Sequence, residues 1–240
     1  MSKPISAKSA LTDLRSLAKA GKAADLQRFF KTAPGEYGEG DIFLGVMVPQ
    51  TREIAREYRD MSLAEIEKLV SSKFHEARLC GLIILTNQFL ASKEPATKKV
   101  IFNFYLRQMK DGHINNWDLV DVTAPALGQY LLGIRNPYAI LDKLATSKSL
   151  WERRLSIIFT FAFIRAGDFG PTIEISKMLI DDEHDLIHKA VGWSLREVGK
   201  RDIGVLRVFL GEYSNQMPRT MLRYAIEKLP EKERKKWLAA

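Results

Sequence analysis

Cysteine is almost absent from the chain, because Cys80 is the only one among 240 residues. A disulfide framework and a cysteine-rich zinc module are therefore excluded. Histidine is also scarce, and of the four present only His184 and His188 have the i,i+4 spacing of a metal-binding pair. They lack the flanking motif of a zinc enzyme, so we interpret them as part of an exposed helix face and expect no metal site and no cofactor.

Long apolar runs are missing too. The longest, residues 155–164, is about half of the roughly 18 residues that span a bilayer. Lys3, Lys8 and Asp13 interrupt the N-terminus, which therefore has no apolar signal-peptide core. We expect no membrane partner and a cytoplasmic protein, associated with the nucleoid if its source is prokaryotic.

Neither sign of charge is concentrated in a tail. The chain has 37 basic and 29 acidic residues, a formal net charge of +8, and residues 1–140 and 141–240 share this excess equally. Any strongly positive surface must therefore be formed by folding. The excess favours a polyanion as partner, most commonly nucleic acid, although a basic protein without such a partner is an alternative of equal weight.

Apolar residues recur with a period of 3.6 almost throughout, whereas period-two patterns are nearly absent. Ser62 and Glu65 have the spacing of a capping box, and Pro95, Pro137 and Pro171 stand where the first turn of a helix tolerates proline. These patterns predict an all-α protein with short connections. The predicted helices are 5–20, 22–32, 50–60, 62–72, 74–91, 95–110, 115–131, 136–146, 149–166, 170–181, 183–200, 202–212 and 217–229.

Some of these helices repeat. The segments are EARLCGLIIL from Glu76, INNWDLVDVT from Ile114, ERRLSIIFTF from Glu152, HKAVGWSLRE from His188 and, more loosely, RTMLRYAIEK from Arg219. They begin 38, 38, 36 and 31 residues apart, and each follows a shorter amphipathic helix. This period predicts an α-solenoid of HEAT-like helix pairs with a concave surface. An irregular α-bundle is the alternative.

Residues 33–49 interrupt the helical pattern with four glycines and two prolines. No GKS or GKT follows the last glycine and no strand precedes the segment, so a phosphate-binding P-loop is not favoured. We interpret it as a structural joint. The chain is then predicted to form one domain, residues 1–240, in which this joint connects N-terminal helices (1–32) to the repeats (50–240).

One residue is unusual for its place in the repeat. The residues seven positions after the start of each copy are Ile83, Asp121, Phe159, Leu195 and Ile226. A carboxylate in a position that is otherwise apolar is costly to bury unless it is paired or used, so Asp121 is the first functional candidate. The alternative, of equal weight, is that Pro125 alters the helix and turns Asp121 towards water.

Tryptophans and cations gather near this position and near its counterparts. Trp117 lies four residues before Asp121 and therefore on the same helix face, although tryptophan is more often a core residue. In the third copy Arg154 follows Trp151 closely. In the fourth copy one helix face carries Lys189, Trp193, Arg196 and Lys200. Such cations would neutralise DNA phosphates while the indole packs on a sugar or base; the alternative is a solvated face with Trp193 packed against the next repeat.

The chain resembles the DNA alkylation repair family, whose best-known members are AlkD-like alkylpurine DNA glycosylases built from HEAT-like repeats. The matching segments are YGEGDIFLGVMVPQTRE from Tyr37, NNWDLVD from Asn115, LWERRLSI from Leu150 and KAVGWSLREVGK from Lys189. They occur in the family's order and at its spacing, and the resemblance covers the chain from about residue 26 onward.

The resemblance implies roles for five residues: Asp121, Trp117 and Trp193 as catalytic residues, and Arg154 and Arg196 as DNA-binding residues of a concave groove. Lys189 and Lys200 share the face of Arg196, and we expect them to bind DNA as well. Family members can offer a tyrosine to DNA from the N-terminal helix. Here Phe29 and Phe30 are the nearest candidates, and neither supplies a hydroxyl.

The activity that the resemblance implies is that of a monofunctional DNA glycosylase in base excision repair. Such an enzyme hydrolyses the N-glycosidic bond of positively charged N3- or N7-alkylated purines in double-stranded DNA, and we expect it to act as a monomer. One alternative is a non-catalytic HEAT-repeat protein that recognises DNA structure, and another is a protein–protein scaffold. Asp121 and Trp117 favour the enzyme, because a pure binder needs no carboxylate facing phosphates. A scaffold predicts an apolar or acidic concave face.

Overall fold

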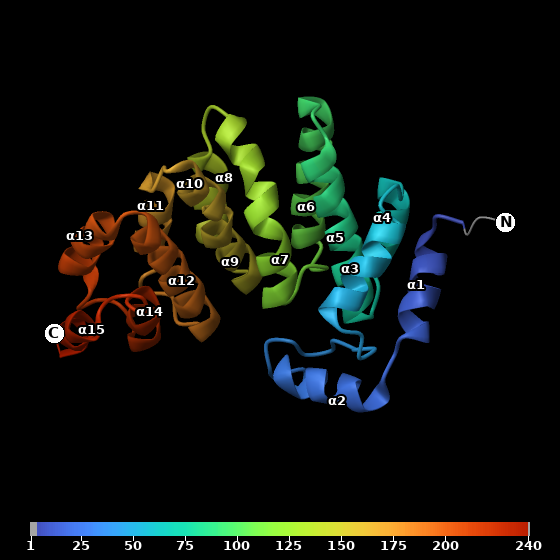
Figure 1. Ribbon diagram of the computed structural model, residues 1–240, viewed down its shortest axis with the longest axis horizontal. Helices are drawn as coiled ribbons and strands as arrows, with labels where there is room; N and C mark the ends of the chain where they lie inside the picture. The colour runs from blue at the N-terminus through green and yellow to red at the C-terminus, as the bar shows by residue number, and fades with distance from the viewer. Residues whose placement is uncertain (1–3, 240) are drawn as a thin grey trace. The chain divides into compact units, whose positions relative to one another are not determined.

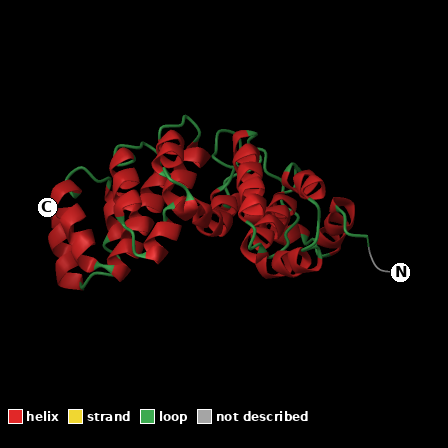
Figure 2. Ribbon diagram, turned by 90° about the horizontal axis from the view of Figure 1, so that it is seen from above, coloured by secondary structure: helices red, strands yellow, loops and turns green. Residues whose placement is uncertain are grey.

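The computed structural model describes residues 4–239, which fold almost entirely into helices (Figure 2). These residues contain no strand, and one isolated parallel bridge pairs Ile42 with Phe74. The all-α prediction is therefore confirmed. Within the same range, none of the helices has the length and apolar character that crossing a membrane requires.

The chain divides into two compact units, residues 1–123 and 124–240, and the boundary falls inside α7 (Trp117–Leu127). Helices that follow one another in the sequence pack together within each unit, as α4 does with α5 and α8 with α9. This packing is compatible with HEAT-like pairs. The organisation of all 240 residues as a single domain stays a prediction.

In the first unit, α5 is the central helix, and α3, α4 and α6 pack against it (Figure 1). Every residue from His75 to Thr86 is buried, as expected for a helix that is covered on all sides. The helices of this unit before α7 are α1 (Ala7–Ser16), α2 (Ala20–Phe29), α3 (Val48–Glu57), α4 (Leu63–Val70), α5 (His75–Ala91) and α6 (Pro95–Lys110).

In the second unit, α12 packs against α9, α13 and α14. Gly192 lets α12 and α14 approach closely, because a Cβ at this position would overlap the Met221 carbonyl oxygen and the Tyr224 side chain. The elements of this unit are the 3₁₀ helix η1 (Gly128–Gly133), α8 (Tyr138–Ala145), α9 (Leu150–Phe159), α10 (Phe161–Ala166), α11 (Gly170–Met178), α12 (Asp185–Arg201), α13 (Ile203–Tyr213), α14 (Arg219–Ala225) and α15 (Glu231–Ala239).

Two predicted helices are interrupted in the structure, and one helix was not predicted. The helix predicted at 149–166 is two helices, because Thr160 forms a tighter turn in which its hydroxyl and its N–H both donate to the Ile157 carbonyl. The helix predicted at 115–131 changes to 3₁₀ geometry at Gly128, where a Cβ would overlap the backbone of Phe159. The sequence pattern also gave no indication of α15, whose residues are mostly charged.

The predicted signals for helix starts agree more closely with the structure. Pro95 and Pro171 lie in the first turns of α6 and α11, as predicted, whereas Pro137 is the residue before α8. The Ser62 hydroxyl caps α4 by accepting a hydrogen bond from the Glu65 N–H at 3.4 Å. The Glu65 carboxylate does not complete the predicted box. It accepts instead from the backbone N–H of Ala7 at 2.7 Å, which ties α1 to α4.

The repeat positions are occupied as predicted. The four apolar residues at the position of Asp121 in the other copies are all buried, with exposed fractions of 3% or less: Ile83, Phe159, Leu195 and Ile226. Asp121 itself is half-buried, although α7 continues through Pro125 as far as Leu127. Asp121 is therefore neither in the core nor turned fully to water by the proline.

Candidate functional site

Trp117 and Asp121 occupy the first two turns of α7. Trp117 is the first residue of the helix, and its N–H donates to the side-chain oxygen of Asn116 at 2.8 Å. Asp121 lies four residues later, hence on the same face. Burial raises the pKa of the Tyr105 hydroxyl, its hydrogen bond with Thr123 opposes this, and the negative charge of Asp121 raises it further. The charge of Asp121 therefore acts on Tyr105, a buried residue of the first unit.

An aromatic cluster supports Trp117. Its ring is stacked on Phe30, with centroids 5.1 Å apart and an interplanar angle of 18°. Phe29, the last residue of α2, meets Trp117 edge-on at 6.0 Å and is 63% exposed. Phe30 is buried and also stacks on Phe43 at 5.0 Å. The two phenylalanines of the N-terminal helix pair thus lie beside Trp117, and the exposed one extends its apolar surface.

Buried charged groups lie directly behind this cluster. His75, at the start of α5, places its Nδ1 2.9 Å from Asp41 Oδ2 and its Nε2 2.8 Å from Asp118 Oδ2. Arg78 donates to the other oxygen of Asp41 and to the backbone carbonyl of Ser72. Burial raises the pKa of Asp41, but the hydrogen bond from His75 and the charge of Arg78 outweigh it and hold that pKa below its ordinary value.

The glycine-rich segment is held against these helices by Glu76. Its carboxylate accepts three backbone N–H groups, from Leu44 at 2.9 Å, Gly45 at 2.8 Å and Val46 at 3.2 Å. Gly45 has φ +84°, and a Cβ there would overlap the carbonyl oxygen of Lys19. These N–H groups are therefore already bound, as in a structural joint, and do not offer a cradle for phosphate.

The predicted cation stripe on α12 is paired with carboxylates. Lys189 lies 2.7 Å from Asp185, and Lys200 lies 2.6 Å from Glu197. Arg196, whose side chain is 17% exposed, forms an ion pair with Glu227, which lies two residues after the end of α14. The stripe therefore carries little net charge by itself, and phosphates would have to compete with these carboxylates.

Trp193 is half-buried on α12. It packs edge-on against Phe161 of α10, with ring centroids 4.6 Å apart, and its Nε1–H donates to Glu197 at 3.2 Å. Trp193 and Trp117 belong to different units, and their joint action in one site stays a prediction.

Arg154 has a structural contact in the second unit. It is 4% exposed, and its guanidinium donates to the backbone carbonyl of Leu186 in the first turn of α12. A phosphate contact by this residue would require its guanidinium to leave that buried position. DNA binding by Arg154 stays a prediction.

The two histidines that had a metal-like spacing have other roles. The His184 Nδ1 accepts from the Leu186 N–H at 3.1 Å and so caps α12, while His188 Nε2 donates to the backbone carbonyl of Asp182. Among residues 4–239, no three His, Cys, Asp or Glu side chains are arranged to hold a metal ion.

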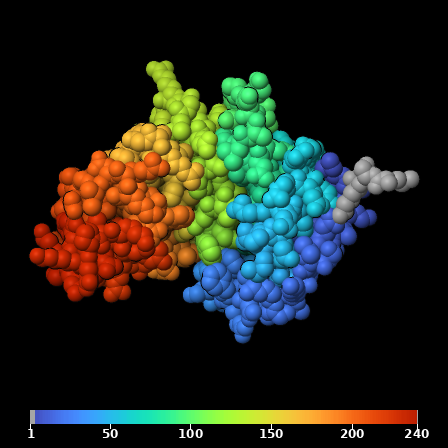
Figure 3. Space-filling view, viewed as in Figure 1, coloured from blue at the N-terminus to red at the C-terminus, as the bar shows by residue number. Residues whose placement is uncertain are grey.

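Net positive charge in the second unit is concentrated at its end. The basic residues from 218 onward are Arg219, Arg223, Lys228, Lys232, Arg234, Lys235 and Lys236, against the acidic Glu227, Glu231 and Glu233. A cavity of about 320 Å³ between α14 and α15 is lined by the basic Arg223, Arg234 and Lys235, the acidic Glu227 and Glu231, and the apolar Ile226 and Leu238. Figure 3 shows this end of the chain in red. This excess of basic residues corrects the expectation that neither sign of charge is concentrated in a tail, which compared only residues 1–140 with residues 141–240.

Sequence reasoning also missed the buried charges around His75. The available signal was the run His75, Glu76 and Arg78 at the start of a helix that is otherwise apolar as far as Leu85. Three ionisable residues at the start of such an apolar helix indicate buried partners elsewhere. One partner of His75, Asp41, is 34 residues away in the chain and the farthest partner of Glu76, Leu44, is 32 residues away, and the sequence pattern does not identify them.

The chain is similar to proteins of one family. A family model described as DNA alkylation repair enzyme matches residues 10–229. A solved structure, a predicted DNA alkylation repair enzyme from Enterococcus faecalis, has a TM-score of 0.70 and 16% sequence identity, and the match covers 89% of this chain and 97% of that one. At this identity the structural likeness shows the fold alone. No curated protein matches the chain.

Proposed function

Because the chain belongs to the DNA alkylation repair enzyme family, whose substrate is DNA, we propose that it is a monofunctional DNA glycosylase. Its substrates would be positively charged N3- or N7-alkylated purines in duplex DNA, and the bond hydrolysed would be the N-glycosidic bond. The enzyme would act as a monomer in the cytoplasm, without a metal or other cofactor.

One observation carries the proposal: the half-buried Asp121 one helical turn after Trp117, on the only copy of the repeat with a carboxylate at that position. Alkylation at N3 or N7 gives the purine a positive charge, so the base is already a good leaving group. Breaking its bond to the sugar builds positive charge on the sugar, as in glycoside hydrolysis. A carboxylate near C1′ stabilises that charge and orients a water molecule, and no general acid is required.

The aromatic cluster supports the same chemistry. The electron-rich faces of tryptophan and phenylalanine attract a cationic partner, and this attraction is worth about 0.5–2 kcal/mol per contact. Trp117, four residues before Asp121, and the exposed Phe29 that packs against it offer such faces within the same unit. Trp193 is proposed to contact the same duplex with its own indole, from the second unit.

Phosphate contacts are proposed at two places. On α12, Lys189, Arg196 and Lys200 would exchange their carboxylate partners for DNA phosphates, which makes affinity dependent on salt. On the last two helices, Arg223 and Arg234 line a cavity that Glu227 and Glu231 also line, so phosphates would compete with carboxylates there as well. Contacts at the second place are therefore expected to add to the salt dependence of duplex binding.

The test is base release from DNA. Purified protein is incubated with methylated duplex DNA in the presence of a chelator, and free 7-methylguanine and abasic sites are quantified. We expect 7-methylguanine to be released and the abasic strand to stay uncleaved, because no lysine has been identified that would form a Schiff base with the sugar. A protein that binds the duplex and releases no base is instead a non-catalytic DNA-structure binder.

A further inference from the structure

His75 is a buried histidine with an acidic partner on each ring nitrogen. The exposed fractions are 1% for His75, 4% for Asp41 and 8% for Asp118, and the two nitrogen–oxygen distances are 2.9 and 2.8 Å. An ionised carboxylate only accepts hydrogen bonds, so both ring nitrogens must donate and the imidazole must carry both protons. Removing one proton from the imidazole would leave a buried carboxylate facing the lone pair of a ring nitrogen.

The charges that face the imidazole come from every element around it and balance one another. Asp41 lies on the glycine-rich segment, Asp118 on α7, and Arg78 on the same helix as His75, where it pairs with Asp41. The ring of Phe43 is stacked on the imidazole, with centroids 4.4 Å apart and an angle of 20°. Two carboxylates and two cations thus form a neutral cluster, and breaking any one pair leaves a buried charge uncompensated.

This cluster has two direct links to the residues of the proposed active site. Asp118 follows Trp117 and precedes Asp121 by three residues, so the hydrogen bond from His75 fixes the first turn of α7. Phe30 contacts both His75 and Trp117: its ring centroid lies 5.2 Å from that of His75 and 5.1 Å from that of Trp117, on which it is stacked. A change at the imidazole is therefore transmitted to Trp117 through the helix start and through the aromatic stack.

We propose that His75, held as an imidazolium between Asp41 and Asp118, is a positioning residue that fixes the first turn of α7 and thereby the orientation of Trp117 and Asp121. It does not touch the substrate. This inference rests on the proposed glycosylase function as far as the reaction is concerned, whereas the orientation of Trp117 is a property of the protein alone.

The proton on His75 makes the arrangement dependent on pH. Burial lowers the pKa of His75, but Asp118 and Asp41 outweigh burial and raise it to about 9. The cluster is therefore complete at neutral pH and is lost as the pH rises through about 9. The rate of base release by the wild type should fall with an apparent pKa near that value, and the Trp117 environment should change over the same range.

The experiment compares the wild type with His75→Gln and with His113→Gln as a matched control. His113 is a half-buried histidine of the same unit whose ring nitrogen pairs with the neutral Gln108 instead of a carboxylate. Single-turnover release of 7-methylguanine, duplex affinity and the indole N–H resonance of Trp117 are measured between pH 6 and 10. We expect His75→Gln to release base at least tenfold more slowly than the wild type at pH 7 and to bind duplex DNA with an affinity within threefold of the wild type. Neither its rate nor its Trp117 resonance should change near pH 9.

Separate results identify separate failures. If the Trp117 resonance of the wild type changes with a pKa near 9 but no base is released, the glycosylase proposal fails and the positioning of Trp117 stands. If the wild type releases base at a rate and with a Trp117 resonance that are both constant up to pH 10, the inference about His75 is overturned. Both readouts use the wild type, so they hold even if His75→Gln does not fold. A folded His75→Gln with wild-type rates also overturns it.

Discussion

Raising the pH from 6.5 to 9 should destabilise the first unit through one group, His75. The pKa of this histidine is 6.5 in its ordinary state and about 9 in the folded protein, where Asp118 and Asp41 outweigh the effect of burial. Between these two values the folded state keeps a proton that the unfolded state has released. The stabilisation is therefore fully present below pH 6.5 and is lost as the pH rises through about 9.

The size of the effect follows from the pKa difference. A shift of one pKa unit corresponds to about 1.4 kcal/mol, so a rise of about 2.5 units contributes on the order of 3 kcal/mol to the free energy of unfolding. This is a large share of the roughly 5–15 kcal/mol that stabilises a typical domain. The steepest decline is expected to approach 1.4 kcal/mol for each pH unit between 6.5 and 9.

The assay is urea-induced unfolding at several pH values. Trp117 is the only tryptophan of residues 1–123, so its indole N–H resonance reports the first unit separately from the second. His75→Gln should unfold at lower urea concentration at pH 6.5 and show a much flatter pH dependence. Equal pH dependence in the wild type and in His75→Gln would refute the assignment of the charge to His75.

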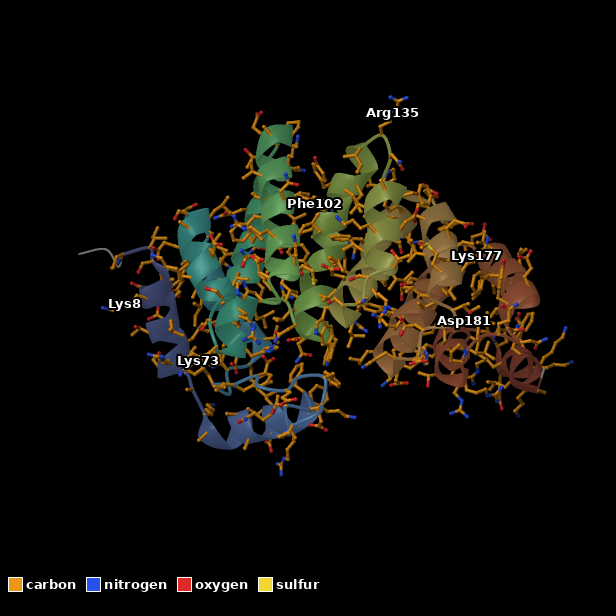
Figure 4. The ribbon with its side chains drawn as sticks, turned by 180° about the vertical axis from the view of Figure 1, so that it is seen from behind. Lys8, Lys73, Phe102, Arg135, Lys177 and Asp181 are labelled. Carbon is orange, nitrogen blue, oxygen red and sulfur yellow. The ribbon has the colours of Figure 1, made fainter. Side chains whose placement is uncertain are left out.

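Two further predictions concern the joint and the last helices. Glu76→Gln should lower the free energy of unfolding by about 2–4 kcal/mol, measured by urea unfolding, because an amide nitrogen then faces a backbone N–H that the carboxylate had bound; an unchanged midpoint would contradict this role. Arg223→Ala with Arg234→Ala should weaken duplex binding in fluorescence anisotropy and reduce its salt dependence. The exposed pair Arg135→Ala with Lys143→Ala is the control, since Arg135 projects away from the helices (Figure 4), and equal losses in both double variants would count against a phosphate site on the last helices.

Much of the fold could be predicted from the sequence because helix periodicity is a local property. The start of α6 at Pro95 and the near-complete agreement for α5 depend on residues inside each helix. The change at Gly128 was not predictable in this way, because Gly128 approaches the backbone of Phe159, about thirty residues away. A long-range contact of this kind has no signature in local periodicity.

In the candidate site, too, local spacing could be predicted from the sequence and long-range partners could not. The unusual status of Asp121 followed from comparing repeat positions, and the burial of Phe159 and Leu195 at those positions is compatible with the register. The basic stripe was harder to judge, because the partner of Arg196 is Glu227, which lies 31 residues further along the chain. A cation's spacing along a helix predicts its face, whereas its ion pairs depend on what the next helix brings beside it.

The central claim is that the Asp121 carboxylate stabilises the sugar cation while the base leaves. The most direct test is single-turnover release of 7-methylguanine from duplex DNA by the wild type, by Asp121→Asn and by the control Asp111→Asn, an exposed aspartate at the end of α6. Asp121→Asn keeps the shape and removes the charge, so we predict at least a tenfold slower release, about 1.4 kcal/mol in activation free energy, with duplex affinity nearly unchanged. Equal rates for the wild type and Asp121→Asn would contradict the claim.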